Sequence, residues 1–243
     1  MAALTAAQLL RVWEEGCTLN QAERPLAVLA EAAPDASHGE LAALSIGRRD
    51  RRLLALREAT FGPRFQALGS CSECGERLEL AFSAADVRAG TDDVGPPGPL
   101  SLGELALEIR LPDSTDVAAA GQCSSIASAR QTIARRCIGS AHRDGVPVAP
   151  ESVPDELIPE IARRLEAADP GADTTLEASC PACQARSELV FDIASFFWAE
   201  IEGEALRLFR DVHRLAQSYG WREADILAMT PLRRRAYLEL LHQ

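Results

Sequence analysis

Apolar residues recur at three- and four-residue spacing through much of this chain, and this pattern predicts a mainly helical protein. The longest such stretch runs over 192–219 and ends at Gly220, a residue typical of helix ends. Helical spacing also predicts helices in the first 68 residues and over most of 116–168. Two stretches rich in glycine and proline, 92–99 and 139–150, are expected to be loops.

Shorter segments alternate apolar and polar residues, as half-buried strands do. Residues 76–83 and 105–111 show this alternation, and 176–191 contains a similar segment. The pattern predicts an α+β fold that is mainly helical, with a small antiparallel module. We expect five segments: an N-terminal helical region 1–68, a first cysteine knuckle with strands 69–115, a helical insert 116–170, a second knuckle with strands 171–194, and a C-terminal helical region 195–243.

Two stretches of the chain, 70–82 and 179–191, are near copies of each other. They share S-C-x-x-C-x-x-R-x-E-L-x-F without a gap. A tight turn between two cysteines points both sulfurs inward, at about 2.3 Å from a metal ion, and two such turns complete a tetrahedron. The repeat therefore predicts a zinc-ribbon-like Zn²⁺ site, and the expected ligands are Cys71, Cys74, Cys180 and Cys183.

Four thiolates leave no open coordination position, so this zinc is expected to be structural. Two features weaken the prediction: Gln184 takes the place of Gly75 in the second copy, and about a hundred residues separate the pairs, far more than in a compact zinc motif. Turns without metal and a redox pair remain alternatives. Redox chemistry is the weaker one, because thioredoxin-like pairs begin a helix whereas these lead into strands.

Composition limits the classes of function. Among 243 residues there are seven cysteines, an odd number that does not suit a disulfide framework but suits a reducing cytoplasm. The net charge of −11 argues against binding to a phosphate backbone. We expect no membrane span and no signal peptide, because the chain lacks a run of about 18 apolar residues and a basic leader.

Two arginine clusters stand out in this acidic chain. They comprise Arg48, Arg49, Arg51 and Arg52 in the first cluster, and Arg233, Arg234 and Arg235 in the second. They fit a solvated helix face with ion pairs, a protein interface, or a nucleic-acid surface. The four histidines are scattered, and no phosphate loop, nucleophile elbow or metalloprotease motif is present, so no enzyme is predicted.

Several segments resemble the baseplate-hub assembly proteins of T-even-like contractile phages and their relatives in phage-tail-like contractile injection systems. The resemblance is carried by R-D-R-R-L-L-A-L-R-E-A-T-F-G at 49–62 with C-S-E-C-G at 71–75, by I-R-L-P-D-S-T-D at 109–116, and by the ending from 212 through 238. Together these motifs cover most of residues 40–240. The second knuckle is not a constant feature of the shorter phage members.

The resemblance implies a non-enzymatic baseplate component or assembly chaperone that acts through protein contacts. Its partners would be baseplate hub or spike proteins, held in part by the two arginine clusters. Its location would be the cytoplasm of the producing bacterial cell, with incorporation into the assembled particle left open. The alternative is a zinc-dependent nucleic-acid-binding or transcription regulatory protein, against which the net acidity argues.

Overall fold

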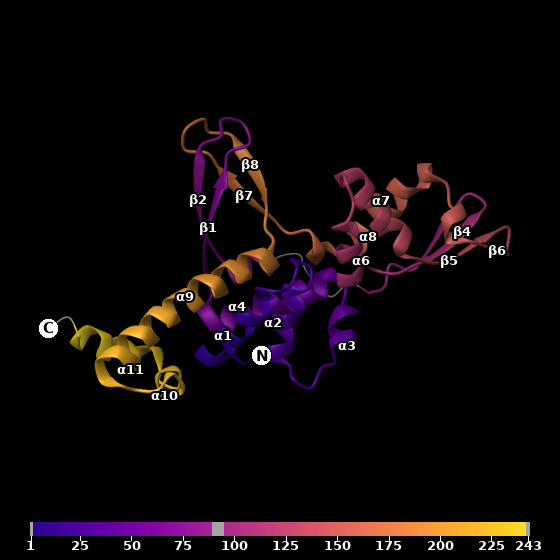
Figure 1. Ribbon diagram of the computed structural model, residues 1–243. Coiled ribbons are helices and arrows are strands. Elements are labelled where there is room, and N and C mark those ends of the chain that lie inside the picture. Colours follow the sequence, from indigo (N-terminus) through magenta and orange to yellow (C-terminus); the bar gives the residue numbers. More distant parts are fainter. Residues whose placement is uncertain (1, 89–94, 242–243) are drawn as a thin grey trace.

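The computed structural model describes residues 2–88 and 95–241 (Figure 1). A helical body lies at the centre, a pair of β-hairpins stands on it, an insert of strands and helices extends to one side, and the C-terminal helices lie at the far end of the longest helix. The body is formed by α1 (Ala6–Gly16), α2 (Arg24–Ala32), α3 (His38–Ala42), α4 (Ile46–Phe61) and α9 (Ile193–Tyr219).

The helices of the body begin and end at residues that suit those positions. Thr5 and Gln8 form a reciprocal capping box at the start of α1, Ser45 caps α4, and Asp192 caps α9. Gly220 adopts a φ of 69° and ends α9, as the sequence predicts. The apolar faces of α1, α2, α4 and α9 share one hydrophobic core.

The paired hairpins come from distant parts of the chain. One hairpin joins β1 (Arg64–Ser70) to β2 (Arg77–Ser83), and the other joins β7 (Thr175–Ser179) to β8 (Arg186–Val190), both antiparallel. A short helix, α5 (Ala84–Arg88), follows β2. The prediction that the chain is helical up to residue 68 is wrong for β1. This strand is stabilised by pairing along its length with β2 and by burial of Phe65, which are contacts that local periodicity does not reveal.

The insert contains an antiparallel sheet with the strand order β3-β4-β5-β6. Its strands are β3 (Pro99–Leu102), β4 (Leu105–Ile109), β5 (Ile138–Arg143) and β6 (Val146–Val148). Its helices are α6 (Ser114–Ala120), α7 (Ile126–Arg136) and α8 (Ile158–Ala168), with the short 3-10 turns η1 (Pro150–Ser152), η2 (Asp155–Leu157) and η3 (Pro170–Ala172).

The sheet of the insert corrects two expectations. The stretch 139–150, expected to be a loop, contains most of β5 and β6, joined by a turn in which Asp144 and Gly145 both have positive φ. Strand β4, expected to belong with the first knuckle, pairs with β5 instead, so the sheet crosses the expected boundary at 115/116. The loop expected at 92–99 lies partly outside the described residues.

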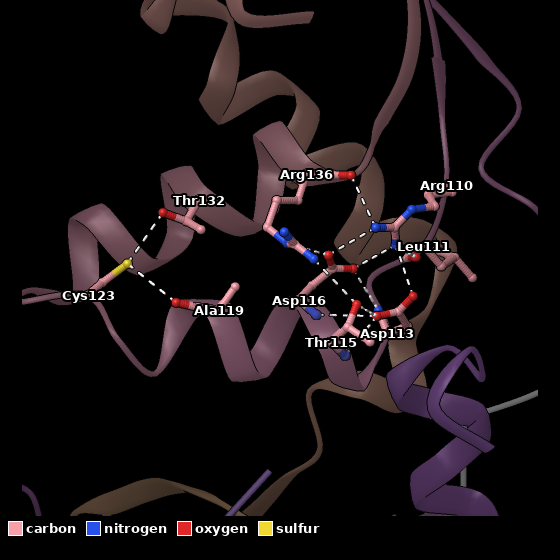
Figure 2. Close-up of polar contacts among 9 residues, drawn as sticks. All are labelled: Arg110, Leu111, Asp113, Thr115, Asp116, Ala119, Cys123, Thr132 and Arg136. Atoms are coloured by element: carbon pink, nitrogen blue, oxygen red, sulfur yellow. Dashed lines mark hydrogen bonds and ion pairs between the residues drawn. The ribbon is translucent and has the colours of Figure 1, made fainter. Parts of the chain in front are cut away.

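A buried carboxylate holds the base of the insert together (Figure 2). The side chain of Asp116 is fully buried and accepts hydrogen bonds from both terminal nitrogens of Arg110, at 2.6 and 2.9 Å, and from Arg136 Nε at 2.8 Å. Burial is the largest influence on the pKa of Asp116 and raises it, but the bonds from Arg110, Asp113 and Arg136 outweigh it and lower the pKa. The charged carboxylate thus joins α6 to the residue that follows β4 and to α7.

The insert is attached to the body at the start of α4. The N–H of Ile46 donates to the carbonyl of Pro112 at 3.1 Å, and the N–H of Gly47 donates to Asp169 Oδ2 at 2.9 Å. A Cβ atom at Gly47 would lie 2.0 Å from Asp169 Oδ1, so this close approach requires glycine. A segment within the insert and the residue that follows its last α-helix therefore meet the same helix terminus.

The C-terminal helices α10 (Glu223–Leu227) and α11 (Pro231–Leu240) pack on the end of α9. Thr230 caps α11, as the Thr-Pro pair in the sequence indicates. The architecture is thus a mixture of helices and small antiparallel sheets, as predicted in its coarse form. Within 2–88 and 95–241, none of the helices has both the length and the apolar character that crossing a membrane requires.

Candidate metal centre

The tips of the two hairpins have the same backbone geometry. In the first tip, the N–H of Cys71 donates to the carbonyl of Glu76 at 2.8 Å, and in the second the N–H of Cys180 donates to the carbonyl of Ala185 at the same distance. The repeat in the sequence is therefore a structural repeat, in which each C-x-x-C turn connects two antiparallel strands.

The residue after the second cysteine of each pair occupies the left-handed region. Gly75 has a φ of 75° and Gln184 a φ of 62°, and their N–H groups donate to the carbonyls of Cys71 and Cys180, both at 3.0 Å. Glycine adopts this conformation readily, whereas a residue with a side chain does so at some cost in energy. Gln184 thus departs from the repeat in sequence but retains its conformation.

The two tips bring the four cysteines together, although more than a hundred residues separate the pairs. All four sulfur atoms lie within 4.8 Å of one another, and Cys71–Cys183 and Cys74–Cys180 each approach to 3.6 Å. The cysteines form no disulfide. A tetrahedron of sulfurs about 2.3 Å from a central zinc has edges of about 3.8 Å, close to the observed separations. These four side chains can hold a metal ion.

The electrostatics of the cluster favour a cation. The backbone N–H groups of Cys74 and Glu73, followed by smaller contributions, lower the pKa of the Cys71 thiol to about 6. For Cys74 the N–H of Glu76 also lowers the pKa, but the neighbouring sulfurs, first that of Cys183, raise it to about 12. Several thiolates so close together repel one another, and a bound cation removes that penalty.

A serine that sequence reasoning did not single out lies beside the sulfurs. Ser187 is buried, and its hydroxyl donates to Cys71 Sγ at 3.6 Å and accepts from the N–H of Ser72 at 3.3 Å. In the first copy of the repeat the equivalent position is Leu78, which is also buried. The sequence therefore contained one signal for Ser187: it is a polar residue at a position of the repeat that faces inward.

The hairpins also contact each other below the tips. Cys71, Leu78 and Cys180 are the buried members of their small shared cluster. A Cβ atom at Gly69 on β1 would lie 2.8 Å from a methyl carbon of Leu189 on β8, so the absence of a side chain permits this contact.

A buried arginine anchors the first hairpin to the body. Arg57 on α4 forms a bidentate ion pair with Glu200 on α9, with distances of 2.7 and 2.5 Å. Its Nη1 donates to the carbonyls of Gly62 and Arg64, and its guanidinium lies 3.7 Å from the ring centroid of Phe65. Burial and bidentate pairing of Arg57 are consequences of tertiary contacts, and sequence reasoning assigned it no such role.

The structure divides the arginines that the sequence predicted to bind partners. Arg49 and Arg234 are buried in internal ion pairs, with Asp50 at 2.7 Å and with Asp211 at 3.0 Å. Each side chain turns inward from its helix, so neither lies on the open surface, and partner binding by these two arginines stays a prediction.

The other members of the clusters are more accessible. Arg48 and Arg52 on α4 and Arg233 and Arg235 on α11 are exposed, and Arg51 is half-buried. Arg235 pairs with Glu239 on the same helix at 2.9 Å. Partner binding by these five arginines stays a prediction.

A comparison with protein families finds a match to the family described as T4 bacteriophage base plate protein, over residues 20–198. The matched part contains α2 to α8, both hairpins, the whole described insert and the start of α9. Helix α1, most of α9, and helices α10 and α11 lie outside it. Comparisons with curated proteins and with solved structures give no significant match.

Proposed function

The chain belongs to the T4 bacteriophage base plate protein family, and from this we propose that it is a non-enzymatic component or assembly factor of the baseplate of a contractile phage tail or tail-like injection particle. The observation that carries the proposal is the family match, which spans both hairpins and the insert. The proposed partners are hub or spike subunits. The proposed place of action is the cytoplasm of the producing cell, where the particle is built.

We propose further that the four cysteines hold one structural Zn²⁺. The support is chemical: four sulfurs at nearly tetrahedral separations, no disulfide, and backbone N–H groups that favour thiolate at Cys71. A closed set of thiolates suits zinc and leaves no open coordination position, so the ion would supply stability rather than catalysis.

The role of such a site follows from where the hairpins lie in the chain. The insert separates them in sequence, so joining their tips closes a loop that contains the insert. Arg57 anchors the first hairpin to the body, and the second leads directly into α9. A metal bound at the tips would therefore hold the insert, the body and α9 in one arrangement.

Partner contacts are proposed at both ends of this arrangement. The exposed Arg48 and Arg52 lie near the attachment of the insert, whereas Arg233 and Arg235 lie on α11 at the far end of α9 (Figure 1). Arginine is enriched at protein interfaces, and separated contacts suit a protein that positions two subunits relative to each other.

The metal is tested by elemental analysis of protein purified without added zinc. The expected result is one zinc per chain in the unaltered protein and in Cys17→Ser, since Cys17 is exposed and lies outside the cluster. The Cys71→Ser/Cys180→Ser variant is expected to bind no stoichiometric zinc. Unaltered protein that folds with no bound metal would overturn the zinc proposal but not the family assignment.

The biological role is tested by deleting the gene in the producing cell and imaging particles by electron microscopy. We expect incomplete particles without an organised baseplate, restored by the unaltered gene and by Cys17→Ser. Mass spectrometry of purified particles then shows whether the protein stays in the finished assembly. Normal numbers of complete, contractile particles from the deletion strain would contradict the proposal.

A further inference from the structure

A hollow of about 890 Å³ lies between the start of α1 and the two C-terminal helices. Its walls are largely apolar, and they include Leu4, Ala7, Ala224, Leu227, Ala228 and Met229. The whole lining comes from residues 4–7 and 222–234, which lie outside the matched range 20–198. This chain thus has a concave apolar surface that the family match does not cover.

A buried charged group lines the same hollow. The side chain of Arg234 is only 5% exposed, and its Nε donates to Asp211 Oδ2 at 3.0 Å. Its Nη1 is buried and has no hydrogen-bond partner within 2–88 and 95–241. Leaving a buried N–H of a charged group unsatisfied is costly, so Arg234 has capacity for an additional acceptor, and an anionic one suits it best.

The charges around the hollow are balanced, in contrast to those of the acidic protein as a whole. Arg222 and Glu223 line it and are exposed, and the charge of Arg234 is offset by its partner Asp211. The complete chain carries −11. Asp211 already neutralises part of the charge of Arg234, so Arg222 is the main attraction at the rim and Glu223 opposes it.

We propose that this hollow docks a segment of a protein partner in which an apolar side chain stands next to a carboxylate. The apolar side chain fills the space between α1 and α10, and the carboxylate interacts with Arg222 and Arg234. A peptide that enters an apolar groove through one anchoring side chain, with charges that set its direction, is a common mode of recognition. The inference rests on the proposed function only for the source of the segment, another subunit of the particle.

The test uses the full-length protein, immobilised, and a random-peptide display library. We expect enriched peptides to place Leu, Ile, Met or Phe beside Asp or Glu. The enriched peptide is then synthesised with a fluorescent label, and its Kd is measured by anisotropy. Ala228→Trp, at an exposed wall position, should fill the hollow and weaken binding about tenfold or more, with circular dichroism to verify folding.

Charge variants test whether the carboxylate of the bound segment contacts the arginines of the hollow. Arg222→Gln is expected to weaken binding several-fold, and Glu223→Gln to tighten it, because the two side chains oppose each other at the rim. Arg234→Leu should weaken binding as well, whereas Arg233→Gln, on the same helix but not lining the hollow, should leave Kd unchanged. Weaker binding by Arg234→Leu supports the proposal only if this variant unfolds at the same temperature as the unaltered protein. Ala228→Trp provides the independent test.

Three results would overturn the inference: no enriched motif, a motif that is basic or purely apolar, or binding that Ala228→Trp does not weaken. The measurement needs no particle and no metal analysis. Normal particles from the deletion strain would therefore contradict the baseplate role without affecting the docking proposal. A peptide selection that yields no motif would contradict the docking proposal without affecting the baseplate role.

Discussion

The paired hairpins bury Cys71, Leu78 and Cys180 in a cluster of their own, whereas the insert buries ten of its described side chains around Leu107 and Ile161. Both are small units of similar strand content, but different interactions must stabilise them. Apolar burial stabilises the insert by about 25 cal/mol for each Å² removed from water. An isolated two-stranded hairpin is marginal in water. The body supports the base of the first hairpin through Phe65, so it is the tips that need another source of stability. The four cysteines at their tips are placed to provide it.

Removing the proposed zinc should have the largest effect and should act on one of the two regions only. Zinc binding stabilises small zinc-finger peptides by about 10–16 kcal/mol, so a chelator should leave the hairpin tips without their main support. Hydrogen–deuterium exchange with and without a strong zinc chelator measures this. We expect β2 and β8 to lose protection from exchange while β4 and β5 keep it.

The Cys17→Ser variant serves as the control, because it retains all four clustered cysteines. Its hairpins should be protected without chelator and exposed with it, as in the unaltered protein. Equal protection of β2 and β8 with and without chelator would mean that the hairpins are stable without metal. This result would contradict the proposed difference between the hairpins and the insert.

Replacing Asp116 with alanine should act on the other region. The change leaves Arg110 and Arg136 close together without the carboxylate that both bind. Breaking a fully buried ion pair costs about 3–5 kcal/mol, but both arginines are more than 40% exposed and water screens their charges, so we expect a cost of about 1–3 kcal/mol. We expect the insert to unfold at lower urea concentration, with the zinc content unchanged.

A matched control is Glu108→Ala in the same region. Glu108 is exposed and accepts a hydrogen bond from Ser140, so its loss should change stability by no more than about 0.5 kcal/mol. A metal content that falls in Asp116→Ala would show that the two regions are coupled rather than independent.

Acid should weaken the insert through the same carboxylate. The folded state lowers the pKa of Asp116 below its ordinary value near 3.8, since its hydrogen bonds outweigh the effect of burial. The stabilisation is therefore fully present above about pH 4, the unfolded pKa, and is lost as the pH falls through the lower folded pKa. Urea unfolding of the insert at pH 6, 4 and 3, monitored by hydrogen–deuterium exchange, should show this loss. The stability of Asp116→Asn should depend less on pH than that of the unaltered protein.

Changing Gly69 to alanine should have the smallest effect and should act on the hairpins. The new Cβ would lie 2.8 Å from the flexible end of Leu189, which can shift, so we expect a cost of about 1 kcal/mol with metal bound. Gly39→Ala is the control, because no atom lies within 4 Å of its added Cβ. Faster exchange in β1 and β8 of Gly69→Ala alone would support close packing between the hairpins, and identical exchange in both variants would contradict it.

Sequence reasoning succeeded where neighbouring residues decide the structure. The end of α9 at Gly220 was predicted, and it depends on residues within one helical turn. The repeated C-x-x-C turns belong to the same group, because each is closed by hydrogen bonds between residues a few positions apart.

The errors lie where distant residues decide. Strand β5 contains Gly139, Ser140 and His142, which favour no regular structure strongly, and it becomes a strand because β4 and β6 pair with it on both sides. An Asp-Gly pair at 144–145 was a local signal for this hairpin that could have corrected the expectation of a loop.

The sequence by itself determined the helices with their caps, the two knuckle turns and the residue types at their tips, because these depend on short-range geometry and on the chemistry of cysteine. Only the tertiary structure decided that Cys71 lies 3.6 Å from Cys183, that Ser187 lies beside them, and that Arg49 and Arg234 turn inward. Such contacts join segments far apart in the chain, and burial depends on what the rest of the fold packs against each side chain. No local pattern contains that information.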